Sequence, residues 1–539
     1  MRNYLKVLFI IFLLGGFLRL YKLESYPPSI YWDEAAIGYN AYSIAQTGRD
    51  EYGVSHPILF KSFNDFKLPG YIYTDTIFVK LFGLSPTTTR LPSALFGALA
   101  PIAVFLIARK LFDEKTALIA AFFLAISPWH LQFSRAAFEA TISFTLILFG
   151  IVFLIYGQKN KLMIPLAAVT FSLSLYFYLA ARVIVPLIIL SFILINLKKQ
   201  RGNLNSYIIG FALAILISTP ILLSAFSSSG LKHLKEVSLF EDRTLLNTYV
   251  EAGANDKNPL SKIFLNRRVP YMFESLHKYF SHYSPGFLFF GDDPNPRHHP
   301  PFQGNLYLYE IILLPLGFWN LLKAKNNQTK FFILSIFLIS PIPAAFSKES
   351  PHSLRTMLML LPLVLTSALG ASYILKYILK KTGAKLIFAA IIILFFINYL
   401  YTYYKLYPIR DSAAWAYGYQ QMTREVSKIQ EDYDRIIVTG YYWKPYIYYL
   451  FFNNIDPEVY QKNPDIQLIG KYRFGTTFWD SGGKNLDEET IDQLLDKKTL
   501  VVLSPQEFLA LKNKDRFKQL LSVNDYSNRN SIFLIGEWN

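Results

Sequence analysis

Apolar segments separated by short polar stretches recur along the first 405 residues of the chain. A helix needs about 17–25 consecutive apolar residues to cross a bilayer, and most of these segments reach that length. The pattern predicts about eleven membrane-spanning helices, within a range of about ten to thirteen because two of the segments are short. Their approximate positions are 5–20, 91–111, 115–128, 140–157, 162–179, 183–197, 206–226, 306–322, 330–346, 355–375 and 384–404.

The first apolar segment has the basic start of a signal peptide but lacks the end of one. Arg2 and Lys6 precede it, and no small-residue cleavage site follows, since Arg19, Tyr21 and Lys22 come instead. We therefore interpret this segment as a retained first transmembrane helix.

The loops between the predicted spans divide by charge. If the N-terminus is cytoplasmic, every short loop on that side is basic, as membrane orientation requires. The basic residues are Arg109, Lys110, Lys115, Lys159, Lys161, Lys198, Lys199, Arg201, Lys323, Lys325, Lys330, Lys376, Lys380, Lys381 and Lys385. The opposite loops carry the acids Asp33, Glu34, Glu139, Asp292 and Asp293. The alternation predicts a multi-pass plasma-membrane protein with these acids on the outer face.

Two outward loops are long enough to fold. Loop 21–88 is expected to form short helices, one of them starting at Asp33 or Glu34. Loop 227–305 is expected to contain a helix over 261–283, followed by a segment rich in glycine, proline and aspartate.

The tail turns polar after residue 405 and alternates strand-like and helix-like runs. Strands are predicted at 435–439 and 499–503, and helices at 488–495 and 505–511. We therefore predict a transmembrane domain over 1–405 that includes both outward loops. A small extracytoplasmic α/β domain over 406–539 is expected to follow it.

The composition agrees with a polytopic membrane protein. The chain is 52% hydrophobic and only 17% charged, with a mean hydropathy of +0.26. It contains no cysteine, which excludes disulfides, zinc–thiolate sites and a cysteine nucleophile. The net charge of +16 falls in short loops, so it indicates membrane orientation and no nucleic-acid partner.

The acidic pair Asp33 and Glu34 has two interpretations. A helix N-cap with a favourable acid in the first turn is worth about 0.5–2 kcal/mol. Alternatively, one carboxylate is a general base that accepts a proton from an incoming hydroxyl, which contributes about 10²–10⁴ in rate. The residue pattern leaves both interpretations open.

Other charged residues on the outer side have a structural and a functional interpretation each. Lys67 either reaches toward the membrane interface or binds a phosphate, with Asp65 as its partner or as a second acid. Arg135 and Glu139 are four residues apart, which predicts that they share one helix face. Further outward cations either anchor helix ends or converge on an anionic headgroup, and these are Arg182 and Arg355.

One loop invites a metal interpretation. Asp292, Asp293, His298 and His299 lie close together in a proline-rich stretch. Neighbouring histidines in such a loop are more often solvated side chains than ligands, so we assign no metal site there.

Three short motifs, in this order and placement, resemble those of the C-type-fold membrane glycosyltransferases. The nearest resemblance is to glycosyltransferase family 39, with the protein O-mannosyltransferases and the lipid A aminoarabinose transferases. The motifs are Trp32-Asp33-Glu34-Ala35 after the first span, Lys67-Leu68-Pro69-Gly70-Tyr71 before the second, and Ser134-Arg135-Ala136-Ala137-Phe138-Glu139 before the fourth. The resemblance covers residues 1–405, and the tail is similar to a variable extracytoplasmic domain.

The resemblance implies an inverting hexosyl or pentosyl transferase with a polyprenyl-phosphate-linked sugar donor. Transfer is expected on the outer face of the membrane, to a hydroxyl of a protein, lipid or glycan. The resemblance makes Asp33 the base on the acceptor hydroxyl, with Glu34 supporting it or binding the acceptor. Lys67 matches the family's lysine near the donor phosphate. Asp65 is included in the substrate-binding set on its position beside Lys67, and not on the resemblance.

The remaining site residues follow from the same resemblance. Arg135 and Glu139 match the second-loop cluster of the family, and Arg182 and Arg355 are expected to contact the phosphate or headgroup. This chemistry demands no cofactor, and we expect no essential metal.

Two other classes of protein stay open. A transporter also has many spans, but it usually buries ionisable residues in mid-span and often shows inverted repeats. A non-catalytic membrane scaffold needs no aligned acids at all. The clustering of ionisable residues at one face favours the enzyme.

Overall fold

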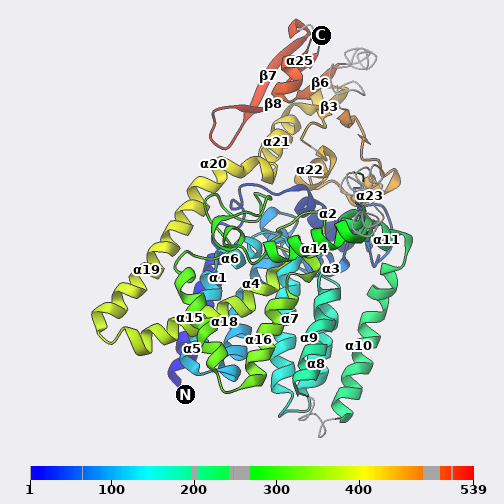
Figure 1. Cartoon of the computed structure of the whole chain (residues 1–539). Helices are drawn as coiled ribbons and strands as arrows, with labels where there is room; N and C mark the ends of the chain where they lie inside the picture. Colours follow the sequence, from blue (N-terminus) through cyan, green and yellow to red (C-terminus); the bar gives the residue numbers. More distant parts are fainter. Residues whose placement is uncertain are drawn as a thin grey trace, which may run out of the picture. The chain divides into compact units, whose positions relative to one another are not determined.

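Helices dominate the computed structural model of the chain, and strands gather near its C-terminus (Figure 1). The structure describes residues 2–63, 65–196, 204–241, 247, 268–442, 444–476, 498–511 and 514–538. The helices up to residue 401 are α1 (Arg2–Leu20), α2 (Trp32–Thr47), α3 (Pro69–Phe82), α4 (Pro86–Leu111), α5 (Glu114–Ile126), α6 (Pro128–Ser134), α7 (Glu139–Tyr156), α8 (Met163–Ser174), α9 (Ala181–Asn196), α10 (Leu204–Ala225), α11 (Ser228–Val237), α14 (Arg268–Ser281), α15 (Glu310–Lys323), α16 (Asn327–Ile339), α17 (Ile342–Ala345), α18 (Leu360–Tyr373) and α19 (Thr382–Tyr401).

Each of the eleven predicted apolar segments overlaps a helix or a helix pair. Within the described ranges, six helices are long and apolar enough to cross a membrane. They begin at Pro86, Glu139, Leu204, Asn327, Met357 and Thr382. A seventh candidate is the pair α5–α6, which bends by 52° between its two helices. The helices α8 and α9 are apolar but shorter, so the number of eleven crossings stays a prediction.

Two glycines let α15 and α18 pack closely. A Cβ atom added at Gly317 would collide with the backbone oxygen of Thr366, and one added at Gly370 would collide with that of Leu313. Small residues at such contacts allow membrane helices to approach each other.

Replacing Gly317 by alanine is expected to destabilise the protein by about 1–3 kcal/mol, because backbone atoms must move to admit the methyl group. The measurement is the thermal unfolding midpoint in detergent. Gly383→Ala is the control, since Gly383 has no atom within 4 Å of the added Cβ. Equal midpoints for the two variants would contradict the prediction.

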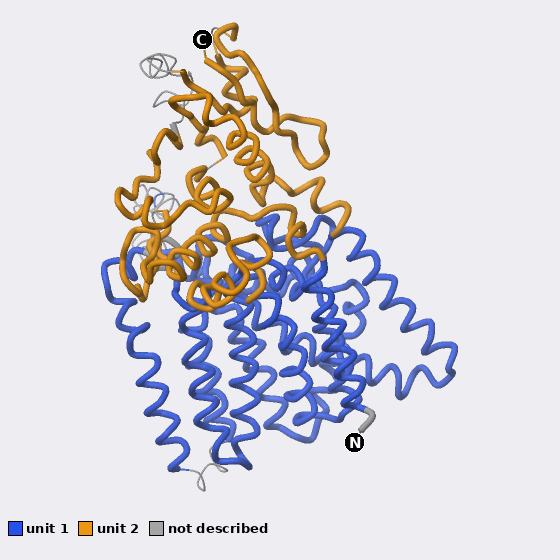
Figure 2. The backbone as a smooth tube through the Cα atoms, turned by 180° about the vertical axis from the view of Figure 1, so that it is seen from behind, with its two compact units in different colours: residues 1–21, 68–71, 93–403 blue, residues 22–67, 72–92, 404–539 orange. Residues whose placement is uncertain are grey.

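The chain forms two compact units, drawn in blue and orange in Figure 2. Their residues are 1–21, 68–71 and 93–403 in the first unit, and 22–67, 72–92 and 404–539 in the second. The second unit therefore contains most of the loop 21–88 as well as the tail.

A six-stranded mixed sheet lies in the second unit, with strand order β4-β5-β3-β6-β8-β7. Its strands are β3 (Arg435–Thr439), β4 (Leu468–Ile469), β5 (Tyr472–Thr476), β6 (Thr499–Leu503), β7 (Phe517–Asn524) and β8 (Ser531–Trp538). The central strand β3 pairs in parallel with β5 and β6, and the outer pairs are antiparallel. The tail helices include α21 (Tyr419–Ile429), α22 (Pro445–Phe452), α23 (Pro457–Lys462) and α25 (Pro505–Ala510).

The central strands β3 and β6 are buried on both faces, as expected for apolar strands in the middle of a sheet, whereas the edge strand β7 is largely exposed. On β3, Ile436 and Val438 face a core that also contains Ala35 and Tyr39 of α2. Ile437 faces the opposite core. The first-loop helix α2 is therefore fixed against the same core as the tail strands.

The tail predictions can be compared with these elements. Both predicted strands are present at their expected positions, and the helix expected at 505–511 is α25. The helix expected at 488–495 lies outside the described residues. In the second loop, the described part of the helix predicted over 261–283 is α14.

Candidate active site

The acidic pair lies in the first turn of α2, as predicted from the sequence. Tyr31 is the N-cap residue, and its backbone N–H donates to the Glu34 carboxylate at 3.3 Å. Glu34 thus supplies the capping contact that satisfies an otherwise free backbone donor. Because Glu34 does this, the capping interpretation applies to Glu34 rather than to Asp33.

Glu34 also forms a fully buried ion pair with Arg90. Arg90 Nε and Nη2 donate to the two Glu34 carboxylate oxygens, each at 2.9 Å, and neither side chain is exposed. Two-point pairing of this kind fixes orientation as well as charge. It fits the supporting role predicted for Glu34 and leaves that carboxylate no exposed oxygen for an acceptor.

Arg90 holds the loop that leads into α2. Its Nη1 donates to the carbonyls of Leu23 at 3.0 Å and Pro27 at 3.1 Å, and its Nη2 donates to that of Ser29. The sequence analysis overlooked Arg90. The signal was available, because Arg90, like Arg182, stands at the start of an apolar span, on the side that the sequence predicts to be outer.

Asp33 pairs with Lys67. Lys67 ends strand β2 (Asp65–Lys67), which forms a short antiparallel hairpin with β1 (Phe60–Ser62). The Asp33 side chain is 31% exposed and that of Lys67 is 11% exposed. Asp65 is two residues before Lys67 on the strand, so both side chains leave the same face. The structure therefore brings Asp33 and Lys67 together and leaves the Asp33 carboxylate accessible.

Two buried carboxylates in the second unit were not predicted. Glu51 and Asp75 are fully buried, and their oxygens meet no hydrogen-bond partner among the described residues. The hydroxyls of Tyr52, Tyr446 and Tyr460 are likewise buried and have no hydrogen-bond partner in the described parts of the chain. Burial raises the pKa of Glu51 to about 8, which nearby lysine charges only partly offset. No sequence pattern distinguishes these acids from solvated loop or helix residues.

Glu51 makes the stability of the protein depend on pH. A folded-state pKa of about 8, against 4.5 for the ordinary side chain, means that the folded chain keeps a proton that the unfolded chain releases. As far as Glu51 is concerned, the free energy of unfolding is therefore highest below the ordinary pKa of 4.5. It declines as the pH rises from that value through the folded-state pKa of about 8. Glu51→Gln is expected to raise the free energy of unfolding at pH 8 by about 1–3 kcal/mol, and less at pH 5.

Thermal midpoints at both pH values test this expectation. Glu458→Gln is the control, because Glu458 is an exposed acid in the same unit. A Glu51→Gln variant less stable than the wild type at pH 8 would contradict the prediction.

The predicted helical pair of Arg135 and Glu139 is wrong. Helix α6 ends at Ser134 and α7 begins at Glu139, so a break separates the two residues. Arg135 is 1% exposed and leaves the helix to donate to the carbonyls of Leu18 and Tyr21 at the end of α1. Cations favour such carbonyl ends. Arg135 therefore holds the end of α1.

Arg182 and Arg355 retain unused donors. The Nε and Nη2 atoms of Arg182 and the Nη1 atom of Arg355 are buried without a hydrogen-bond partner in the described parts of the chain. Tyr178 interacts with both Arg355 and Glu139. A small cavity of about 20 Å³ is lined by Tyr178, Arg355 and the start of α9. Buried arginine donors of this kind suit an anion.

An apolar groove of about 720 Å³ lies in the first unit. Its lining consists almost entirely of apolar and aromatic side chains from the segments around α14 and α17, namely Phe240, Tyr271, Met272, Leu276, Tyr279, Ile342 and Phe346. Such a groove suits a hydrocarbon chain.

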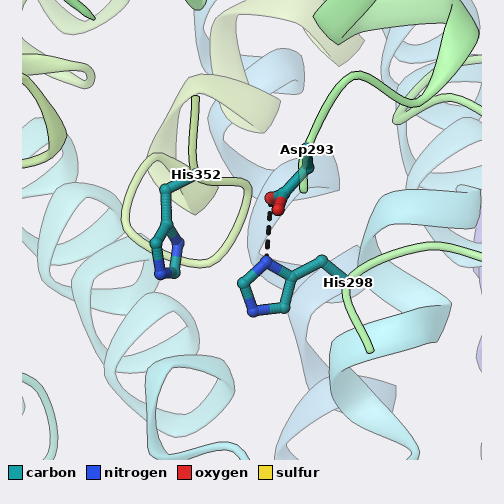
Figure 3. A group of neighbouring side chains, drawn as sticks. All are labelled: Asp293, His298 and His352. Carbon is teal, nitrogen blue, oxygen red and sulfur yellow. Dashed lines mark hydrogen bonds and ion pairs between the residues drawn. The ribbon is translucent and has the colours of Figure 1, made fainter. Parts of the chain in front are cut away.

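The histidine-rich loop forms a buried cluster, but with different members from those considered in the sequence. Asp293, His298 and His352 each offer a ligand atom within 4.8 Å of the others (Figure 3). His299 instead contacts the backbone oxygen of Asp293 at 3.0 Å. The third member was missed because His352 belongs to a separate segment.

Known proteins resemble this chain in part of its sequence. Residues 64–223 match the family model of the dolichyl-phosphate-mannose-protein mannosyltransferases. The dolichyl-phosphooligosaccharide-protein glycotransferase 2 of Pyrococcus horikoshii is 35% identical over 97 residues. That match spans 18% of this chain and 12% of the relative's length.

Solved structures resemble the fold of nearly the whole chain. ArnT from Cupriavidus metallidurans, bound to undecaprenyl phosphate, has a TM-score of 0.53 at 11% identity, covering 99% of this chain and 97% of that chain. AglB from Archaeoglobus fulgidus, an oligosaccharyltransferase in complex with an inhibitory peptide and a dolichol-phosphate, has a TM-score of 0.51 at 16% identity, covering 93% and 69%. At these identities the likeness concerns the fold alone.

Proposed function

Because residues 64–223 are a domain of glycosyltransferase family 39 on a C-type membrane glycosyltransferase fold, we propose that this protein transfers a sugar from a polyprenyl phosphate to an acceptor hydroxyl. The reaction inverts the anomeric carbon and takes place on the outer face of the membrane. The N-terminus is cytoplasmic, and the tail lies outside. The sugar is a hexose or a pentose, and the acceptor is a protein, a lipid or a glycan.

The observation that carries this proposal is the accessible carboxylate of Asp33 beside Lys67. Glu34 and Arg90 are fully buried and fix the start of α2, so the neighbouring Asp33 has a defined position. A base held in this way, within reach of an incoming hydroxyl, is what general-base catalysis requires. Lys67 supplies a cation at the same place.

In the proposed reaction, Asp33 accepts the proton of the acceptor hydroxyl. The hydroxyl oxygen then forms a bond with the anomeric carbon of the sugar, and the bond from that carbon to the phosphate oxygen breaks. The phosphate leaves with the electron pair, still attached to its polyprenyl chain. Lys67 can leave its ion pair with Asp33 and pair with this phosphate instead. This change frees the Asp33 carboxylate to act as the base and neutralises the charge that develops on the phosphate.

Other residues support the donor in this scheme. Arg182 and Arg355, with their unused buried donors, contact the phosphate or headgroup. Asp65 lies beside Lys67 on β2 and contacts the substrate. The apolar groove suits the polyprenyl chain. The two structural neighbours were solved with lipid phosphates, which supports a donor of that class. With these cations available, the transfer requires no metal and no other cofactor.

The test is a donor panel with the reconstituted full-length protein. Liposomes would carry polyprenyl phosphates linked to labelled hexoses or pentoses, and release of the free polyprenyl phosphate would be measured with and without membrane-fraction acceptors. Turnover of at least one donor is expected. If no donor turns over while the protein remains monodisperse and folded, the proposal is wrong.

A further inference from the structure

Three buried side chains from two separate segments of the first unit converge on one point. Asp293 and His298 lie in the loop after residue 290, and His352 lies in the turn before the helix that starts at Leu360. Their exposed fractions are 4%, 3% and 6%. Figure 3 shows the two imidazole rings side by side, with the Asp293 carboxylate above His298. The ring centroids of the two histidines are 4.7 Å apart.

The hydrogen bond within the cluster marks the place for an ion. His298 Nδ1 lies 2.8 Å from Asp293 Oδ2, so the two atoms share one proton and face the same point. Metal binding releases the protons of its ligands, so an ion that takes the place of this proton is bound by both atoms.

His352 completes the set of ligands. Its Nδ1 receives only a long bond, 3.3 Å, from the backbone N–H of Arg355. The nearby His282 is not available, because its Nδ1 bonds to the Lys278 carbonyl and its Nε2 accepts the backbone N–H of His352. The cluster therefore offers two imidazoles and one carboxylate.

This ligand set selects among metal ions. Calcium takes six to eight oxygen ligands, and magnesium requires octahedral oxygen ligation, whereas one carboxylate is present. Zinc accepts two nitrogens and one oxygen in tetrahedral geometry, with a fourth position for water. The aromatic rings of Phe133 and Phe138 pack against His298 and restrict the room for further ligands. The chain has no cysteine, so a zinc site must be built from such groups.

We propose that Asp293, His298 and His352 bind one zinc ion that ties the loop 291–301 to the turn 347–356. The two segments already share a hydrogen bond, because the backbone N–H of Ser353 donates to Asp293 Oδ2 at 2.6 Å. The ion adds bonds between the same two segments. This site is independent of the proposed function, and the ion takes no part in sugar transfer.

The test measures bound zinc on the full-length protein in detergent. The protein is treated with a chelator, incubated with zinc chloride and freed of excess metal. Its zinc content is then measured by elemental mass spectrometry. The wild type is expected to hold about one zinc ion per chain, and His352→Gln and His298→Gln about tenfold less. His277→Gln is the control for adventitious binding, because His277 is an exposed histidine, and it should keep the wild-type content.

A second measurement uses the wild type alone, so that the proposal can be tested even if the variants fail to fold. Cobalt(II) added to the chelated wild type is expected to give the visible absorption of a tetrahedral site and to saturate at about one equivalent. Zinc should also slow hydrogen exchange in 291–301 and 347–356 of the wild type. Zinc content well below one per chain, equal content in wild type and His352→Gln, or no tetrahedral cobalt spectrum would overturn the proposal.

Discussion

Asparagine in place of Asp33 is expected to slow sugar transfer about 10²–10⁴-fold, because the amide cannot accept the acceptor proton. The fold should survive the change. Asp33 is 31% exposed, and the capping contact at the start of α2 comes from Glu34. The measurement is release of polyprenyl phosphate by reconstituted wild type and variant. Because the base acts only in the transition state, the loss should appear in kcat rather than in KM.

Two further variants make the Asp33 result specific. Lys67→Met removes the neighbouring cation and should both raise the KM for the donor and lower kcat, since it weakens phosphate binding and leaves the charge that develops on the phosphate without its cation. Glu24→Gln changes an exposed acid of the same loop and should leave both constants unchanged. If Asp33→Asn keeps the wild-type kcat and the wild-type thermal midpoint, another group must be the base.

Glutamine in place of Glu34 is expected to destabilise the protein by about 3–5 kcal/mol, because it leaves the Arg90 charge buried without its partner. Both side chains are fully buried, and two hydrogen bonds of 2.9 Å join them. For a unit of this size the loss corresponds to a fall in thermal midpoint on the order of 10 °C. Thermal unfolding in detergent, followed by intrinsic fluorescence, measures it.

A matched control distinguishes burial from charge alone. Glu425 and Lys428 form an exposed ion pair at 2.6 Å in the same unit, and Glu425→Gln should cost less than about 1 kcal/mol. A double variant in which Arg90 is also replaced by methionine should recover part of the Glu34→Gln loss, because the buried charge is then absent. Equal midpoints for Glu34→Gln and Glu425→Gln would refute the structural role of the buried pair.

Much of the fold could be predicted because its signals are local. Apolar segments of sufficient length became helices, and the β-branched runs around Ile436 and Val501 became strands β3 and β6. The start of α2 at the acidic pair was also predicted. These features depend on residues that are neighbours in the sequence, and the periodic pattern records them directly.

The site was predicted less completely because its contacts are distant in sequence. Glu34 and Arg90 are 56 residues apart, and Arg135 lies 117 residues from Leu18, whose backbone carbonyl accepts its hydrogen bond. No local pattern indicates such partners. The expected helical pairing of Arg135 failed for the same reason, since the residue leaves its helix to reach α1. His352 likewise joins the cluster of Asp293 from another segment.

The shared core of α2 and the tail strands has a consequence for the order of synthesis. Asp33 is synthesised long before β3 and β6, whose side chains complete the core under α2. Domains generally fold as units when their chain is complete. A nascent or truncated chain that ends before β6 therefore inserts its early helices into the bilayer while α2 lacks its support. The start of α2, and Asp33 with it, is therefore fully supported only once the tail strands have folded.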